Sequence, residues 1–455
     1  MSNTVNYSEV KPEVQKLAGL CTAETIPAEL YTKFNVFRGL RDLHGNGVRA
    51  GLTRIAEVTA KKMIDGVETP MDGKLYYRGI DVEDIVAGHM RERRLGFEET
   101  IYLLLFGALP TAGALREFNE LLSFYCSLPP KFARDVIMKA PSTNMMNTLA
   151  RSVLTLYAYD DNPDDISIPN TLRQCLQLIA MFPLLAVYGY QAYVHYHCGG
   201  SLMLHQPDPA CSIAENILRL LRPDQRYTEL EAKILDAALV LHAEHGGGNN
   251  STFAIRVVSS SATDTYSAVA AALGSLKGPK HGGANISVSH MMKDLQAHVA
   301  NPADEGQLAD YLQKLLRKEA FDRSGLIYGM GHAIYSLSDP RARVFERFIK
   351  QLSAEKGREE EYATYAAVAR LAPQLIAAGR KIYKGVSANI DFYSGFVYDM
   401  LGIPEELYTP IFAISRMAGW AAHRIEELHT SNRIIRPAYK SVVDMQPYTP
   451  LDERA

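Results

Sequence analysis

The segment "FEETIYLLLFGALPT", which spans Phe97–Thr111, shows most clearly what kind of structure this chain forms. It predicts a helix that ends at Gly107, because Pro110 just beyond cannot continue the helix. From Asp81 onward, most of the remaining sequence follows a helical pattern. The sequence therefore predicts a mainly α-helical protein of the all-α class.

A second predicted helix covers Glu229–His245. Four of its residues are three or four positions apart and therefore share one helix face: Ile234, Ala238, Leu241 and His245. The glycines that begin at Gly246 supply the permissive residues that a helix end favours. We therefore expect this helix to end at His245.

Strand-like segments gather between Arg49 and Tyr77, near the N-terminus. Three stretches there are typical of short strands punctuated by glycine: "GLTRIAEVT", "KKMIDG" and "GKLYYRG". The chain of 455 residues is long enough for two or three domain-sized units. No repeat or flexible linker separates such units, so we expect chain excursions to form any second domain.

The stretch from Gln174 to Pro207 contains no aspartate, glutamate, lysine or arginine. A membrane-spanning helix needs roughly 20 predominantly apolar residues, and Cys175–Tyr196 is strongly apolar. Five residues interrupt this run: Gln177, Pro183, Gln191, His195 and His197. A helix buried in a domain core or a subunit interface is therefore favoured over a transmembrane helix.

The composition is that of an ordinary globular protein, with 47% apolar and 22% charged residues. The formal charge of −3 gives no global attraction to nucleic acid or to an anionic membrane. Any positive charge that binds an anionic substrate must therefore be local. The five cysteines are scattered and include no C-x-x-C pair, which is typical of a reducing compartment. The first thirty residues carry four glutamates and no continuous apolar run, so we expect a cytoplasmic protein.

Three histidine segments flanked by glycine are the first candidates for a functional site. They are "LHAEHGGGNNST" (Leu241–Thr252), "GPKHGGAN" (Gly278–Asn285) and "GMGHAIYSLSDPRA" (Gly329–Ala342). Glycine beside a histidine lets backbone and ligand approach closely, and histidine serves as donor, acceptor or acid near pH 7. A single histidine of this kind is more often a packed core residue, but three such segments favour a site.

A metal site is the alternative for the first of these segments. His242 and His245 are three positions apart on the predicted helix, so both could face one ion. No H-E-x-x-H motif, cysteine pair or clear third ligand accompanies them, and we therefore expect no metal. The stretch "HGGGNN" also fits no phosphate-binding P-loop, because it follows a helix rather than a strand.

A carboxylate and three arginines complete the candidate set. Asp391 lies in "SANIDFYSGFVYDMLGIP" (Ser387–Pro404), where apolar neighbours would desolvate it and raise its basicity. Its alternative role is to cap a helix. Guanidinium groups bind carboxylates bidentately, although each arginine alone could equally be a surface or salt-bridged residue. The three are Arg341, Arg416 and Arg436.

Taken together and in this order, these segments resemble the citrate synthase family. The resemblance begins with "MDGKLYYRGI" (Met71–Ile80), continues through "FEETIYLLLFGALPT" and "SIAENIL" (Ser212–Leu218), includes all three histidine segments and ends at "NRIIRP". It extends over nearly the whole chain. Such a match implies a homodimer in which each subunit has a large helical domain and a smaller one. The implied ranges are 49–280 and 392–455 for the large domain, 281–391 for the small domain, and 1–48 for an N-terminal helical extension.

The resemblance also implies a role for each candidate residue. His281 would hydrogen-bond the thioester carbonyl of acetyl-CoA, Asp391 would remove the methyl proton, and His332 would polarise the oxaloacetate ketone. Four residues would bind oxaloacetate, the last from the neighbouring subunit: His245, Arg341, Arg416 and Arg436. No cofactor is implied, because acetyl-CoA is itself a substrate.

The expected activity is that of an acyltransferase, citrate synthase, which condenses acetyl-CoA with oxaloacetate and hydrolyses citryl-CoA. The same motifs are compatible with 2-methylcitrate synthase, which uses propionyl-CoA, because one methyl group provides only about 1–3 kcal/mol of discrimination. We expect acetyl-CoA to be preferred. A metal-dependent hydrolase is the remote alternative.

The chain departs from the family pattern on its acyl-CoA side. Ser336 stands where the animal-type enzymes have an arginine that binds a CoA phosphate, and Ala388 stands where a proline is usual. CoA would then depend on other cations. The candidates lie just before the Asp391 segment, although a solvated basic surface is an equally good interpretation: Arg380, Lys381 and Lys384.

Overall fold

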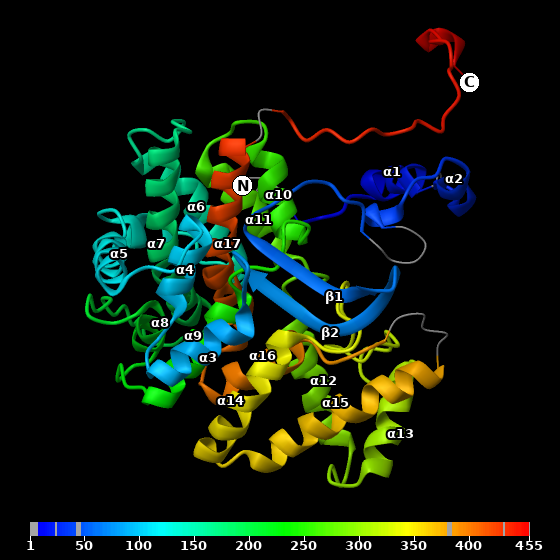
Figure 1. Cartoon of the computed structure of the whole chain (residues 1–455). Coiled ribbons are helices and arrows are strands. Elements are labelled where there is room, and N and C mark those ends of the chain that lie inside the picture. Colours follow the sequence, from blue (N-terminus) through cyan, green and yellow to red (C-terminus); the bar gives the residue numbers. More distant parts are fainter. Residues whose placement is uncertain (1–7, 23–24, 42–46, 380–384, 431–432, 455) are drawn as a thin grey trace. The chain divides into compact units, whose positions relative to one another are not determined.

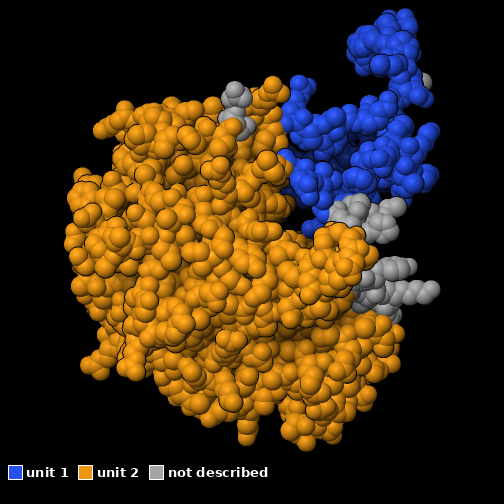
Figure 2. Space-filling model, viewed as in Figure 1, with its two compact units in different colours: residues 1–50, 436–455 blue, residues 51–435 orange. Residues whose placement is uncertain are grey.

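The computed structural model describes residues 8–22, 25–41, 47–379, 385–430 and 433–454. The chain divides into two compact units (Figure 2), of which the first comprises residues 1–50 and 436–455 and the second comprises residues 51–435. The helical elements of the first unit are α1 (Pro12–Thr22), α2 (Ala28–Lys33), η1 (Arg38–Leu40) and η5 (Leu451–Glu453).

The second unit is mainly helical, so the predicted all-α class is confirmed (Figure 1). Its first half contains α3 (Val82–Glu92), α4 (Phe97–Phe106), α5 (Ala112–Tyr125), η2 (Ala133–Met138), α6 (Met145–Leu156), η3 (Tyr157–Tyr159), α7 (Ile168–Cys198), α8 (Ile213–Leu221) and α9 (Glu229–His242). Its second half contains α10 (Asn250–Ser259), α11 (Thr265–Lys277), α12 (Ala284–His298), α13 (Glu305–Leu316), α14 (Pro340–Lys356), α15 (Glu359–Gly379), α16 (Ile390–Met400), η4 (Glu405–Leu407) and α17 (Tyr408–Thr430).

The strands of the second unit form a long antiparallel ribbon rather than the three short strands predicted. Strands β1 (Ala56–Ile64) and β2 (Val67–Tyr77) pair along their length, and β3 (Ile80–Asp81) pairs with the end of β2. Asp65 and Gly66 connect β1 to β2, with φ angles of 51° and 79°. A two-residue turn with positive φ at both positions matches the twist of a hairpin. The stretch "KKMIDG" is therefore the end of one strand and its turn, not a separate strand.

Helix α4 begins at Phe97 and is followed by Gly107, which has a φ of 87° and ends the helix where the sequence predicts. Its N-terminus is capped from a distance. The Asp236 carboxylate accepts hydrogen bonds from the amides of Gly96 and Phe97, at 2.7 and 3.1 Å. Because this cap comes from α9, the sequence around α4 gives no sign of it.

Helix α9 ends at His242, three residues before the predicted end at His245. The reason lies in β2, whose Tyr77 places its hydroxyl 3.0 Å from the Val240 carbonyl and 3.1 Å from the Glu244 carbonyl. Because this buried hydroxyl occupies the end of the helix, the chain turns away there. His245 consequently leaves the helix face that the sequence pattern assigns to it.

Among the described helices, α7 is the one that is long and apolar enough to cross a membrane. Within its most apolar stretch, however, 89% of the residues are buried inside the protein. It packs against α5, α6, α8 and α17. This burial agrees with the predicted core helix.

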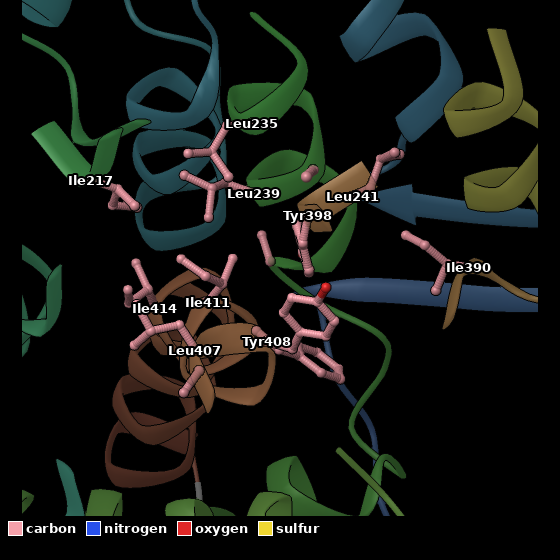
Figure 3. Close-up of a cluster of buried hydrophobic side chains, with 14 of the residues drawn as sticks. Ile217, Leu235, Leu239, Leu241, Ile390, Tyr398, Leu407, Tyr408, Ile411 and Ile414 are labelled. Carbon is pink, nitrogen blue, oxygen red and sulfur yellow. The ribbon is translucent and has the colours of Figure 1, made fainter. Parts of the chain in front are cut away.

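Helix α17 organises the core of the second unit, because it packs against α4, α7, α9 and α10. Figure 3 shows one part of that core, where Leu235 and Leu239 of α9 lie near Ile411 and Ile414 of α17. All four side chains are almost completely buried. Burial of such a side chain stabilises the fold by about 1.5–3 kcal/mol. This packing fixes α17, which carries Arg416, against the end of α9, which leads into His245.

The predicted small domain, residues 281–391, lies within the second unit and includes helices α12 to α15. Helix α13 packs against α15, and α14 packs against α15 and α16. The division into a large and a small domain stays a prediction.

Candidate active site

Two segments that are far apart in the sequence pair at the candidate site. Met330 and Ala388 form an antiparallel bridge. The Gly331 amide donates to the Ser387 carbonyl at 2.8 Å, and the Asn389 amide donates to the Gly329 carbonyl at 2.9 Å. The side-chain amide of Asn389 donates a further hydrogen bond across the same gap, at 2.9 Å. His332 follows the first segment and Asp391 follows the second. The bridge therefore sets the relative position of these two side chains.

Gly329, at the start of this bridge, has no room for a side chain. Its φ is 76°, and a Cβ atom there would lie 2.7 Å from the Cβ of Phe392 in α16.

We expect Gly329→Ala to destabilise the protein by more than the roughly 1–2 kcal/mol that a left-handed backbone alone costs. It should also lower activity, because the segments of His332 and Asp391 would separate. Gly357→Ala is the matched control, since Gly357 has a φ of 64° and open space around it. Denaturant unfolding of both variants measures the difference. Equal losses would show that contact with Phe392 is unimportant.

Asp391 lies in the first turn of α16 but does not cap it. The N-cap is Asn389, whose side chain accepts from the Asp391 amide at 3.0 Å. The residue as a whole is partly exposed. Desolvation by the surrounding protein raises the pKa of Asp391 to about 6, even though the charge of Arg341 opposes this rise. A carboxylate of this kind is a stronger base than an ordinary aspartate and is still ionised at pH 7.

His332 is held as a neutral hydrogen-bond donor. Its Nδ1 accepts from the backbone amides of Ile334 and Tyr335, at 3.1 and 3.2 Å. These two donors require a lone pair on Nδ1, so the ring proton is on Nε2. The ring also stacks on Tyr335, with 4.6 Å between centroids and an interplanar angle of 25°.

His245 contacts both His332 and Tyr335. Its Nε2 lies 3.2 Å from the Tyr335 hydroxyl, and its ring is edge-on to the His332 ring with centroids 4.9 Å apart. Burial and the charge of Arg341 lower the pKa of His245 well below its ordinary value, so the ring is neutral. Tyr335 itself is completely buried. Sequence analysis did not identify it, because a tyrosine in a mixed segment looks like any other core aromatic residue.

Arg341 is fixed at the start of α14 by its neighbour Asp339. The Asp339 carboxylate accepts from the Arg341 amide at 3.0 Å and from the guanidinium at 3.0 and 2.7 Å. Burial lowers the pKa of Arg341, but this pairing more than reverses the effect. Asp339 also accepts from the Ile390 amide at 3.3 Å, which links Arg341 to α16.

Arg416 lies on α17 and is fully buried. Its Nε donates to the His242 carbonyl at 2.7 Å, and its guanidinium lies 4.7 Å from the centre of the Phe412 ring. Burial lowers the pKa of Arg416 to about 10, so it is charged at pH 7. Its Nη1 has no hydrogen-bond partner among the described residues. A buried cationic donor without a partner is suited to an anionic ligand.

His281 lies between α11 and α12, with its Nε2 3.1 Å from the Ser251 hydroxyl. The indole of Trp420 donates to the same hydroxyl at 3.2 Å. The Ser251 hydroxyl in turn donates to Oδ1 of Asn249, at 3.0 Å. Burial lowers the pKa of His281 to about 4, so the ring is neutral. Neither Ser251 nor Trp420 was identified from the sequence.

These side chains lie close enough to influence one another electrostatically. Four of them lower the pKa of His245: Arg341, His332, Arg416 and His281. The charges of Arg341 and Arg416 likewise act on Asp391. The arrangement combines neutral histidine donors, one carboxylate base and two cations. Such a set can take a proton from carbon while it holds carbonyl oxygens and carboxylates.

Comparison with known proteins agrees with this chemistry. The family model described as "Citrate synthase, C-terminal domain" matches residues 43–438. The chain belongs to the citrate synthase family. The citrate synthase of Haloferax volcanii is 34% identical over 84% of this chain and 93% of that protein. The 2-methylcitrate synthase 1 of Corynebacterium glutamicum is 33% identical over 90% of this chain and 97% of that protein.

Solved citrate synthase structures share the fold. The enzyme of Thermoplasma acidophilum, solved as a ternary complex with carboxymethyl coenzyme A and oxaloacetate, superposes with a TM-score of 0.74 and 27% identity. That match covers 91% of this chain and 98% of the other. The Thermotoga maritima citrate synthase has a TM-score of 0.69 and 29% identity, over 90% and 98% of the two chains. As a member of this family, the protein is an enzyme that transfers an acyl group in a condensation reaction.

The roles predicted for Arg436 and for the three CoA-binding candidates stay predictions. Arg436 is exposed and belongs to the first unit. The proposed CoA-binding residues lie outside the described part of the chain: Arg380, Lys381 and Lys384. His242 is buried against Phe412, with its Nδ1 2.9 Å from the Ala238 carbonyl. In the described ranges, no group of three or more His, Cys, Asp or Glu side chains is arranged to hold a metal ion.

Proposed function

We propose that this enzyme is a citrate synthase that condenses acetyl-CoA with oxaloacetate and then hydrolyses citryl-CoA to citrate and CoA. The observation that carries the proposal is the meeting of a neutral donor, His332, a base, Asp391, and two arginines in one site. Their setting in a citrate synthase family member supports it. So does the Thermoplasma acidophilum relative, which was solved with carboxymethyl coenzyme A and oxaloacetate.

In the proposed first step, Asp391 removes a proton from the acetyl methyl group. A thioester methyl is a weak carbon acid, so the enolate oxygen must be stabilised as its charge develops. His281 would donate to that oxygen from the side opposite the base. Its depressed pKa, about 4, keeps it a neutral donor throughout the pH range of catalysis.

In the proposed second step, the enolate carbon attacks the ketone carbon of oxaloacetate. His332 would donate its Nε2 proton to the ketone oxygen as that oxygen becomes an alkoxide. His245, Arg341 and Arg416 would hold the carboxylates, and orientation of this kind can contribute roughly 7–11 kcal/mol to lowering a barrier. Closure of the predicted small domain would exclude water until citryl-CoA has formed.

Charge balance supports a contribution from a second subunit. Oxaloacetate is a dianion, but Arg341 is already neutralised by Asp339, and Asp391 adds a further negative charge at pH 7. A third cation would reduce this excess of negative charge. We propose that Arg436 of the partner subunit supplies it, so that the active form is a homodimer. We also propose that the enzyme acts in the cytoplasm.

The proposal is tested by following thiol release from acetyl-CoA with and without oxaloacetate. Release that depends on oxaloacetate supports it, and no release in any condition would refute it. Propionyl-CoA should be compared in the same assay, because relatives named citrate synthase and 2-methylcitrate synthase are about equally similar, at 34% and 33% identity. Activity that a chelator abolishes would favour a metal-dependent hydrolase instead.

The pH dependence of the reaction should reflect Asp391. Because the base must be ionised, kcat/KM for the acyl-CoA should be constant above the Asp391 pKa of about 6 and should fall about tenfold per pH unit below it. The pKa of His281, about 4, keeps this donor neutral near pH 6, so it adds no limb there. An acid limb near pH 4, the value for an ordinary aspartate, would contradict the assignment.

A further inference from the structure

Glu244 lies next to His245 in the sequence and has no part in the chemistry proposed above. Its side chain is completely buried. Its Oε1 accepts from the Gly246 amide at 2.6 Å and lies 2.9 Å from Nε2 of His423. Its Oε2 has no hydrogen-bond partner among the described residues. Burying a carboxylate is costly unless a positive charge compensates it.

His423 holds Glu244 in place and is itself fixed from behind. Its Nδ1 faces two nitrogens of Arg256, at 3.0 and 2.6 Å. A guanidinium only donates, so Nδ1 must be the acceptor and the His423 proton must be on Nε2, where Glu244 accepts it. Arg256 has its own carboxylate partners, Glu426 and Glu427. His423 is therefore a neutral donor, and it does not balance the charge of Glu244.

Arg416 supplies a positive charge that favours the ionised form of Glu244. The Glu244 carboxylate lies against α17 at Gly419, where a Cβ atom would be 2.3 Å from Oε2, one turn beyond Arg416. Among the charges that act on Arg416, that of Glu244 favours the cation most strongly, whereas Arg341 opposes it. Nη1 of Arg416 and Oε2 of Glu244 are both without a hydrogen-bond partner in the described ranges. The charge of Glu244 therefore acts on Arg416 from a distance, whereas Asp339 pairs with Arg341 directly.

We propose that Glu244 is a positioning residue that acts through Arg416. It weakens the affinity of Arg416 for a substrate carboxylate. This inference rests on the proposed function, in which Arg416 binds oxaloacetate. A substrate carboxylate at Arg416 shares the cation with Glu244, so it binds less tightly than it would to an uncompensated arginine. In the enzyme without substrate, the nearby charge of Glu244 means that Arg416 is not an isolated buried cation.

Glu244→Gln tests the proposal, because it removes the charge but keeps an acceptor for Gly246 and His423. We expect the Kd for oxaloacetate, measured by titration calorimetry, to fall about tenfold. The KM for oxaloacetate should fall by a similar factor while kcat changes less than about threefold, since ground state and transition state gain equally. The Tm of the free variant should fall, and oxaloacetate should raise it by more than in the wild type.

The matched control is Glu231→Gln. Glu231 is also buried, lies near the other end of α9 and pairs with Arg222 at 2.6 Å. Its loss should lower Tm without changing the Kd for oxaloacetate, which separates general destabilisation from the effect on Arg416.

A folded Glu244→Gln variant that binds oxaloacetate as weakly as the wild type, or more weakly, overturns the inference. If that variant does not fold, Glu244→Asp replaces it, since the shorter side chain draws the charge back from Arg416. Its Kd should fall about twofold to threefold, and an unchanged or higher value overturns the inference equally. A wild-type enzyme that neither binds nor consumes oxaloacetate refutes the proposed function instead.

Discussion

Asp391→Asn is expected to lower kcat by about 10²- to 10⁴-fold, the range that general base catalysis contributes. The amide has nearly the size of the carboxylate but cannot accept the methyl proton. The fold of α16 should persist, because Asn389 rather than Asp391 caps the helix. Thiol release in the presence of saturating oxaloacetate measures the loss. The Kd for oxaloacetate should change little, because other residues hold its carboxylates.

The same variant should be more stable than the wild type at pH 7. The folded-state pKa of about 6 lies above the ordinary value of 3.8, so ionisation of Asp391 opposes folding. Stability from this group is complete below about pH 4 and is lost as the pH rises through about 6. Removing the charge should recover on the order of 1–3 kcal/mol in denaturant unfolding. Equal losses of stability, binding and turnover would indicate that Asp391 is structural.

His332→Asn is expected to lower kcat by about 10²- to 10³-fold, as the loss of one donor to a developing oxyanion does in other enzymes. The substitution is chosen for its geometry. The Asn oxygen can take the place of Nδ1 and accept from the Ile334 and Tyr335 amides, as asparagine does in turns. The donor at Nε2 is lost. The loop should therefore keep its structure but no longer donate a hydrogen bond to the ketone oxygen. Steady-state kinetics and thermal unfolding separate the two effects.

His290→Asn is the matched control for this variant. His290 is a half-exposed histidine on α12 whose Nε2 lies 2.8 Å from Glu405, and it is not among the proposed site residues. Its replacement should leave kcat unchanged. A His332→Asn variant with nearly wild-type kcat would remove His332 from the proposed mechanism.

Local sequence signals predicted the fold well where the cause of a boundary is itself local. Gly107 ends α4 as predicted, because its own backbone conformation ends the helix. The end of α9 was predicted wrongly, because Tyr77 from a strand more than 150 residues earlier occupies it. The ribbon was divided too finely, since "GLTRIAEVT" and "KKMIDG" were interpreted as separate strands, whereas β1 continues from the first stretch into the second and ends at Ile64.

The order of motifs in the sequence identified His281, His332 and Asp391 as candidate site residues. The structure adds the backbone pairing and the hydrogen-bond partners that position them. The bridge between Met330 and Ala388 joins two segments whose pairing no local pattern indicates. The partners that set ring protonation and position are backbone amides and common side chains, which have no distinguishing sequence pattern. They include Ser251, Tyr335 and Asp339.

Trp420 is the single tryptophan of the chain, and it is completely buried. Through Ser251 it is two hydrogen bonds from His281. The tryptophan emission of the unlabelled enzyme therefore comes from one indole beside the proposed thioester site. Any ligand that displaces or repolarises the Ser251 hydroxyl changes the surroundings of that fluorophore. Rapid-mixing experiments on the native protein can thus time the arrival of an acyl-CoA separately from the release of its thiol.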